Sequence, residues 1–274
     1  MARISKEDHY LEKIEPYRAR IQSLLKQEEV MLQIIEKDNR GAAVKYLALV
    51  DEMIFLTSNY IVLAGVSESV LRLRNQEVLN AGRKSLYKAV IYLEKVVGSL
   101  IDAPFSEYAE HLAEIATVDA GRRYALIRKM GLAIRLLQSA YGDNTKWKWA
   151  FVELEGRYAA VAKNIIDLKA AAVNADPRSP EYEPMVRHLK LVKRILLYTA
   201  SRYRDKYELS TNNIDDFRMG IQFLGALRRI HSLFWERQDA EAIKKKIDIW
   251  QTKMEDDRKK QREAAPKRIQ DDQQ

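Results

Sequence analysis

The densest group of chemically active residues lies between Arg187 and Lys206, which contains seven Lys and Arg and a single acid, Asp205. At helical spacing, its apolar residues gather on one side of a helix. Five cations gather on the opposite side within an arc of about 120°: Arg187, Lys190, Lys193, Arg194 and Arg204. Such a face suits a phosphate backbone or an acidic protein or lipid surface, and it is also the pattern of a solvated helix face.

A second group combines carboxylates with an imidazole. Glu107, Glu110, His111 and Glu114 lie three and four residues apart, so a helix would place them on one face. Di-metal centres in helical bundles use such side chains, but they need Glu-x-x-His on two helices, and this segment reads Glu-x-x-x-His. We therefore predict a solvated face here and no metal site.

The apolar residues near the end of the chain form a third candidate. We expect one helix that begins near Ile214 and continues past Trp250, because its apolar residues resume after the lysines at 244–246. If this helix is longer than its neighbours, Ile247, Trp250 and Met254 are exposed at its end and form an oligomer or partner contact. His231 lies among apolar residues and is interpreted as a hydrogen-bonded core histidine.

Two tryptophans alternate with lysines at 146–149. Adjacent positions point about 100° apart on a helix, so one indole is expected to pack inward and the other to lie near the surface. An exposed Trp beside lysines can stack on a base or anchor a partner. The alternative is a core edge covered by lysine stems.

The signatures of known catalytic and cofactor sites are absent from the sequence. It contains neither a phosphate-binding Gly-x-x-x-x-Gly-Lys, nor Gly-x-Gly-x-x-Gly after a strand, nor Gly-x-Ser-x-Gly, nor His-Glu-x-x-His. The absence of cysteine excludes disulfides, thiolate metal sites and cysteine nucleophiles, and four histidines leave little material for general acid–base catalysis. The sequence predicts a protein that is not an enzyme and binds no cofactor.

Charge and hydropathy narrow the class of protein further. The 274 residues have a net charge of +8, and residues 177–237 alone contribute +5, from twelve bases and seven acids. The excess charge is therefore local. The first residues are too charged for a signal peptide, and the longest uncharged part of the most apolar stretch, residues 53–67, is shorter than the ~20 residues of a transmembrane helix. We expect a cytoplasmic protein without a transmembrane segment.

The pattern of the whole chain is helical, without the alternation typical of strands. We expect helix breaks near Gly41, at Asn80-Ala81-Gly82, at Pro104, after Tyr141 and within the proline-rich residues 173–184. The first long helix has a heptad-like seam. Because the seam spans only about three heptads and Glu28 interrupts it, we expect a packed bundle helix rather than a dimeric coiled coil. Its members are Ile14, Tyr17, Ile21, Leu24, Glu28, Met31 and Ile35.

The expected fold is all-α, with seven to eight helices in a multi-helix bundle or a short α-solenoid of antiparallel hairpins. Residues 1–174 form an N-terminal region, 175–184 a linker, 185–254 a long-helix region packed on the first, and 255–274 a charged, disordered tail. The predicted function is that of a non-catalytic scaffold or adaptor that binds other proteins, with homo-oligomers as one form. The alternative is nucleic-acid binding through the basic face at 187–206.

Overall fold

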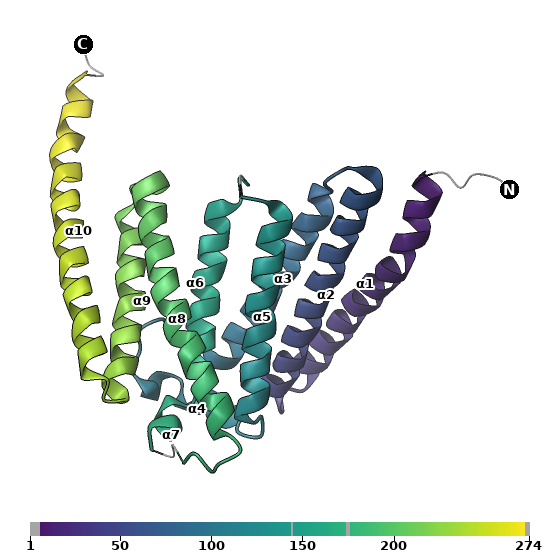
Figure 1. Ribbon diagram of the computed structural model, residues 1–274, viewed down its shortest axis with the longest axis horizontal. Helices are drawn as coiled ribbons and strands as arrows, with labels where there is room; N and C mark the ends of the chain where they lie inside the picture. Colours follow the sequence, from purple (N-terminus) through teal and green to yellow (C-terminus); the bar gives the residue numbers. More distant parts are fainter. Residues whose placement is uncertain (1–5, 144, 174–175, 272–274) are drawn as a thin grey trace. The chain divides into compact units, whose positions relative to one another are not determined.

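A computed structural model of the chain describes residues 6–143, 145–173 and 176–271 (Figure 1). Helices make up most of these residues, and no β-strand occurs among them. Within this part of the chain, eight α-helices are longer than six residues, in agreement with the seven to eight expected from the sequence. The all-α fold class is confirmed.

The elements follow one another with short connections. The long helices are α1 (Lys6–Lys37), α2 (Ala42–Leu71), α3 (Gln76–Val97), α5 (Ala120–Tyr141), α6 (Lys148–Asn164), α8 (Tyr182–Lys206), α9 (Ile214–Leu233) and α10 (Arg237–Asp271). The short ones are a 3-10 helix η1 (Phe105–Glu107), α4 (Ala109–Glu114), α7 (Leu168–Val173) and a π-helical turn η2 (Tyr207–Thr211).

The described residues form two compact units. The first contains residues 6–99, 105–167 and 176–188, and the second contains 100–104, 168–173 and 189–271, with the gaps given above. The boundary after residue 188 falls inside α8, beyond the linker expected at 175–184. Residues 174 and 175, where the expected N-terminal region meets that linker, lie outside the described residues.

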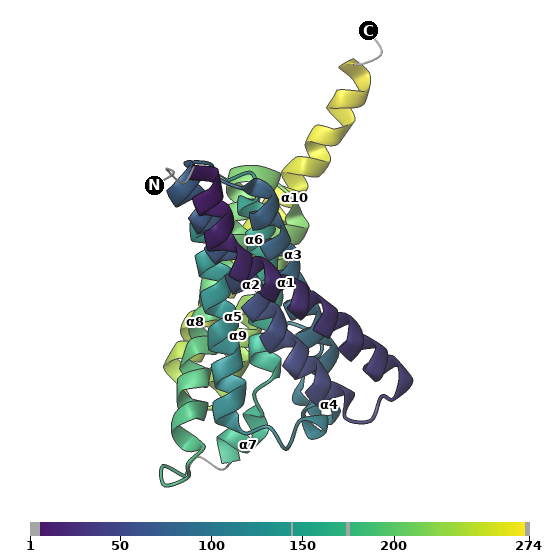
Figure 2. The same ribbon diagram turned by 90° about the vertical axis from the view of Figure 1, so that its right-hand side faces the viewer.

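In the first unit, α2 packs against α1, α3 and α5. Figure 2 shows α1 and α2 side by side as an antiparallel pair. Contact with three neighbours explains why α2 is apolar around most of its circumference. By length and composition alone, α2 is the one helix of the described residues that is long and apolar enough to cross a membrane. Half of its most apolar window is buried inside the protein.

The contact between α2 and α3 explains an error in the expected helix boundaries. The chain turns at 72–75, where Arg72 has a φ of 60° and Asn75 caps α3 by accepting a hydrogen bond from the Val78 N–H. Gly82 lies inside α3, and a Cβ at this position would be 3.2 Å from the Cβ of Tyr60. The glycine at 82 therefore allows close packing of two helices, and the break predicted at Asn80-Ala81-Gly82 is wrong.

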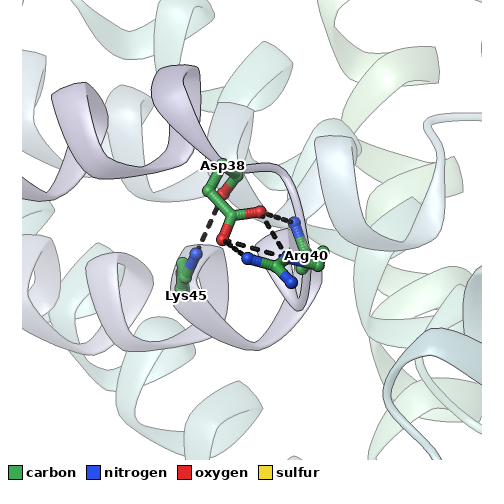
Figure 3. A network of polar contacts seen from close by, with 3 residues as sticks. All are labelled: Asp38, Arg40 and Lys45. Atoms are coloured by element: carbon green, nitrogen blue, oxygen red, sulfur yellow. Dashed lines mark hydrogen bonds and ion pairs between the residues drawn. The ribbon is translucent and has the colours of Figure 1, made fainter.

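The turn between α1 and α2 is fixed by local polar contacts (Figure 3). The Asp38 carboxylate accepts hydrogen bonds from the backbone N–H of Arg40 at 3.0 Å and from the Arg40 Nη2 at 2.8 Å. Lys45 donates to the Asp38 carbonyl at 3.0 Å, and Gly41 has a φ of 63°. These contacts lower the pKa of the Asp38 carboxyl, above all through the Arg40 side chain. The predicted break near Gly41 is confirmed.

In the second unit, α9 and α10 form an antiparallel hairpin, whereas the sequence predicts one continuous helix from Ile214 past Trp250. That prediction is wrong. The chain leaves the helix after Leu233 and enters α10 at Arg237, and α10 lies along α9 (Figure 1). The core of this hairpin contains aromatic pairs, with Tyr207 stacked on Phe217 at 4.9 Å and Phe217 5.6 Å from Trp250.

The start of the expected disordered tail is helical in the structure. α10 continues to Asp271, and the Asp257 carboxylate accepts hydrogen bonds from the Tyr207 hydroxyl at 2.9 Å and from Lys253 at 3.0 Å. These contacts between charged and aromatic side chains hold a segment whose apolar content alone favours disorder. The end of the expected tail, residues 272–274, lies outside the described residues.

Candidate functional site

The basic face expected at 187–206 lies on α8. Val192, Leu196, Thr199 and Tyr203 are buried, as the helical spacing predicts, so the cations project from the other side. Most of these cations are already engaged by acids. Arg187 pairs with Glu183 one turn earlier, in the part of α8 that belongs to the first unit.

Within the second unit, the cations on α8 differ in their environment. Arg204 donates to Glu208 at 2.9 Å and lies 5.3 Å over the Trp250 ring. Lys193 is largely buried and donates to Glu236 at 2.6 Å. Lys190 and Arg194 are exposed and have no ion-pair partner among the described residues. The structure therefore reduces the predicted five-cation face to two unpaired charges.

The expected partner contact at Ile247, Trp250 and Met254 is not an exposed helix end. Trp250 is 3% exposed, and Ile247 and Met254 are half-buried. The reason is the hairpin, since α10 folds back along α9 and inserts Trp250 against Phe217 and Gly220. The prediction of an exposed Trp250 is wrong, and the residue belongs to the core of the second unit.

The turn between α9 and α10 exposes a different tryptophan. We call Phe234, Trp235 and Glu236 the hairpin tip. Trp235 is 78% exposed and has a φ of 59°, in the left-handed region that non-glycine residues seldom adopt. The Trp235 N–H donates to the Ser232 carbonyl at 3.3 Å, and the Glu236 N–H donates to the His231 carbonyl at 3.0 Å. These bonds close the end of α9.

Glu236 anchors the hairpin tip to its surroundings. Its carboxylate accepts from Lys193 at 2.6 Å and contacts the Nδ1 of His231 at 2.6 Å. Burial raises the pKa of the Glu236 carboxyl, but the bonds from Lys193 and His231 outweigh burial and hold the pKa below its ordinary value. Glu236 is therefore ionised at neutral pH and fixes the tip against α8 by a charge-assisted bond. The His231 imidazole thus makes the hydrogen bond that the sequence predicts, and the side chain is half-buried at the edge of the tip.

The residues around Glu236 also include potential metal ligands. Ligand atoms of His231, Glu236 and Asp239 lie within 4.8 Å of one another, the one such group found in the described part of the chain. The Lys193 ammonium contacts both oxygens of Glu236, so a metal ion would have to displace a bonded cation. The set fits an ion-pair cluster and does not fit a metal centre.

The group at 107–114 does not assemble a site either. Glu107 lies in η1, while Glu110, His111 and Glu114 lie in α4, so one continuous helix does not present all four side chains. The three glutamates are exposed, in keeping with a solvated surface.

The hairpin tip is the feature that the sequence analysis does not predict. Its signal in the sequence is the interval 236–242, in which Ala240 and Ala242 are the only apolar residues.

Comparison with curated proteins and comparison with solved structures each gave no match. Residues 6–258 match the sequence profile of one protein family, and this range includes every helix discussed above except the last turns of α10. The chain belongs to the TP0443 family.

Proposed function

We propose that this protein is a non-catalytic helical scaffold or adaptor that binds another protein through the hairpin tip. The observation that supports the proposal is the exposure of Trp235 in a left-handed backbone conformation. An exposed tryptophan loses about 25 cal/mol of favourable transfer free energy for each Å² left in water. Tryptophan is one of the residue types that are enriched among the energetic hot spots of protein interfaces.

The backbone at Trp235 adds to this argument. A non-glycine residue in the left-handed region costs on the order of 1–3 kcal/mol and persists where its surroundings enforce it. At the hairpin tip, the bonds of Glu236 to Lys193 and His231 supply that constraint. A rigid tip loses little conformational entropy on binding, which favours affinity.

The charges around the tip indicate the chemistry of the partner. Lys190 and Arg194 flank Lys193 on α8, and Arg237 directly follows the tip. All three are exposed, and none of their side chains has an ion-pair partner among the described residues. We therefore expect a partner with an apolar slot for the indole and an acidic rim, since complementary charge directs association.

A crosslinking experiment tests this proposal. A photo-crosslinking amino acid replaces Ser232, beside the tip, or Leu209, which is 70% exposed in η2, in the full chain within the cells that produce it. The proposal requires a protein crosslinked from position 232 and not from 209. A second copy of this chain is one permitted partner, and light scattering on the purified protein identifies that case.

Affinity measurements with the crosslinked partner complete the test. Replacing Trp235 with Ala removes a hot spot worth about 2 kcal/mol or more, which is a loss of roughly 30-fold in affinity. The matched control, Leu209→Ala, removes another highly exposed apolar side chain and should change affinity by less than about threefold. Equal affinities of the two variants, or crosslinks that do not depend on position, would overturn the proposal.

Nucleic-acid binding is the second candidate, and the exposed Lys190 and Arg194 are the observation that favours it. With Arg237 they offer up to three phosphate contacts, so the slope of log affinity against log salt should be about −2 to −3 for duplex DNA. Charge reversal at Lys190 and Arg194 should abolish retention on a polyanion column. Unchanged retention would dismiss this candidate.

A further inference from the structure

The side of α2 that its neighbours leave open is apolar. Seven residues, three and four positions apart, line up along this side of the helix: Val44, Ala48, Asp51, Phe55, Ser58, Val62 and Gly65. We call them the α2 face. Ser58 is half-buried and the other six are exposed, with Phe55 at 47% and Val44 and Val62 at 41% each. The solvent side of a helix normally carries many charged residues, whereas the α2 face has one, so its composition is that of a contact surface.

A cavity of about 340 Å³ borders the first half of the α2 face, between α2 and α5. Its apolar lining includes Leu47 and Ala48 from α2 and Ala125 and Leu126 from α5. Leu47 and Leu126 are buried, whereas Ala48 and Ala125 are exposed. The cavity is therefore a hollow with an apolar floor, into which apolar side chains of a partner can insert.

The apolar surface continues beyond this cavity on both helices. The Lys129 ammonium donates to the Asp51 carboxylate at 2.7 Å, which sets these two positions side by side. α2 and α5 finish at the same end of the unit in Figure 1, so they run in the same direction. Phe55 follows Asp51 by one turn, and Leu132 and Leu136, which are 49% and 46% exposed, follow Lys129 by one and two turns. Two parallel helices thus present one apolar surface, which is about 30 Å long at 1.5 Å per residue.

Unpaired cations border this apolar surface on both sides. On α1, Arg20 has its guanidinium 5.7 Å from the centre of the Phe55 ring, and Lys13 lies seven residues earlier on the same side of that helix. On α5, which contains no acidic residue, Arg128 and Arg135 border the exposed leucines. These four cations are exposed, and they have no ion-pair partner in the part of the chain that the structure describes.

The nearby acids do not offset this charge. Asp51 is paired with Lys129 at 2.7 Å, and Asp119 is paired with Arg122 at 3.2 Å. Glu52, the next residue on α2, is half-buried, and one oxygen of its carboxylate is closed to solvent. The border of the apolar surface is therefore positively charged.

This charge distinguishes between the possible occupants of the surface. A symmetric dimer places the same patch of two copies against each other. Arg20 and Arg128 would then face the same cations of the second copy, and like charges across an interface oppose association. A partner with acidic groups at its edges is attracted instead. A helix matches the length of the surface, since amphipathic helices bind to apolar grooves through residues at i, i+3, i+4 and i+7.

We propose that the α2 face and the exposed leucines of α5 bind an amphipathic α-helix of another protein, with its apolar residues toward the cavity and acidic residues beside Arg20 and Arg128. A scaffold or adaptor needs more than one binding surface. This surface lies in the first unit and the hairpin tip lies in the second. The two proposals depend on different residues, so either can fail without affecting the other.

Fluorescence anisotropy with a designed peptide tests the proposal. The probe is a labelled helical peptide of about 20 residues, which matches the length of the surface, with leucines three and four positions apart and glutamates on both flanks. A second peptide has lysines in place of the glutamates. We expect the glutamate peptide to bind the full chain with a dissociation constant of about 100 µM or lower, and the lysine peptide to bind about tenfold more weakly. Arg20→Glu should reduce this difference between the peptides.

Two residues of equal exposure provide a matched pair of variants. Phe55→Ala should weaken binding of the glutamate peptide about tenfold, because it removes an aromatic side chain from the centre of the surface. Leu11→Ala should change this affinity by less than about twofold. Leu11 is 48% exposed, but it lies on the side of α1 opposite Arg20. Both variants should melt close to wild type, since neither side chain belongs to the core.

The proposal is overturned if the glutamate peptide does not bind at concentrations up to about 1 mM, or if Phe55→Ala and wild type bind it equally. Two further measurements test the other occupants. If vesicles of phosphatidylserine bind the chain through Phe55 and the glutamate peptide does not, the surface contacts a membrane and the proposal is wrong. A dimer in light scattering that Phe55→Asp converts to a monomer would show that a second copy covers the surface, and it would also refute the proposal.

Discussion

The substitution Trp250→Ala distinguishes between two roles of this residue, a partner contact and a core residue. The sequence predicts a partner contact at the end of a helix, and the structure places Trp250 at 3% exposure between α9 and α10. The ring lies 5.6 Å from Phe217, with the guanidinium of Arg204 and the ammonium of Lys246 each 5.3 Å from its centre. A substitution at this position should therefore affect folding.

The expected loss of stability follows from this burial. A buried aromatic side chain removes about 150–250 Å² from water, and truncation of a buried Trp to Ala costs about 3–5 kcal/mol. Typical domains are stable by only about 5–15 kcal/mol, so the loss is a large fraction of the total. With a urea dependence near 2 kcal/mol per molar, the unfolding midpoint of the second unit should fall by about 1.5–2.5 M.

The assay is urea unfolding followed by far-ultraviolet circular dichroism, with Ile249→Ala as the control. Ile249 is the adjacent residue on α10 and is 67% exposed, so its truncation should change stability by about 0.5 kcal/mol or less. If Trp250→Ala were as stable as Ile249→Ala, the packing of α10 on α9 described above would be refuted. A stable Trp250→Ala variant that fails to bind a partner would instead support the exposed helix end.

Two further stability predictions use other buried contacts. Gly220→Ala should lower the free energy of unfolding by about 1–3 kcal/mol, because its Cβ would be 3.0 Å from the Ala200 carbonyl and 3.2 Å from the Trp250 ring. Gly65→Ala should raise it by about 0.5–1 kcal/mol, because the space around this position in α2 is open. Thermal melts in which both variants shift the melting temperature in the same direction would contradict this packing. Burial lowers the pKa of His188 to about 4, against a bond to the Ala162 carbonyl at 3.1 Å. Because the unfolded chain takes up this proton first, stability is fully present above about pH 6.5 and falls by about 3 kcal/mol as the pH drops to 4 and below. Urea midpoints at pH 7 and about 4.5 should differ less in His188→Gln than in wild type, and an unchanged difference would show that other groups cause the loss.

The sequence predicts the helices better than it predicts their breaks. The buried side of α8 follows from spacing alone, since Val192, Leu196 and Tyr203 are buried as expected. The sequence predicts a helix end at Gly82, because it does not show that α3 approaches Tyr60 so closely. The sequence does not predict the break after Leu233, because residues 226–236 contain neither Gly nor Pro. The turn there is instead fixed by the contact of Glu236 with Lys193 on α8.

The candidate site was less accessible to sequence reasoning, because pairing of charges is a tertiary property. The spacing of the five cations on one side of α8 is visible in the sequence, but their acids are not all neighbours in the chain. Glu208 follows Arg204 by four residues and was within reach of a helical argument. Glu236 follows Lys193 by 43 residues, and only the hairpin brings the two together.

The corrections to both predicted surfaces have a common physical origin at Glu236. Its backbone N–H bonds to His231 and its carboxylate bonds to Lys193, so this residue both closes the end of α9 and neutralises a cation of the basic face. Once the chain reverses there, α10 runs back along α9 and covers Trp250, while the reversal itself exposes Trp235. One turn therefore removes the predicted helix end, neutralises Lys193 on α8 and creates the hairpin tip. Because this turn leaves Trp235 exposed, the hairpin tip is the first place to look for the binding surface.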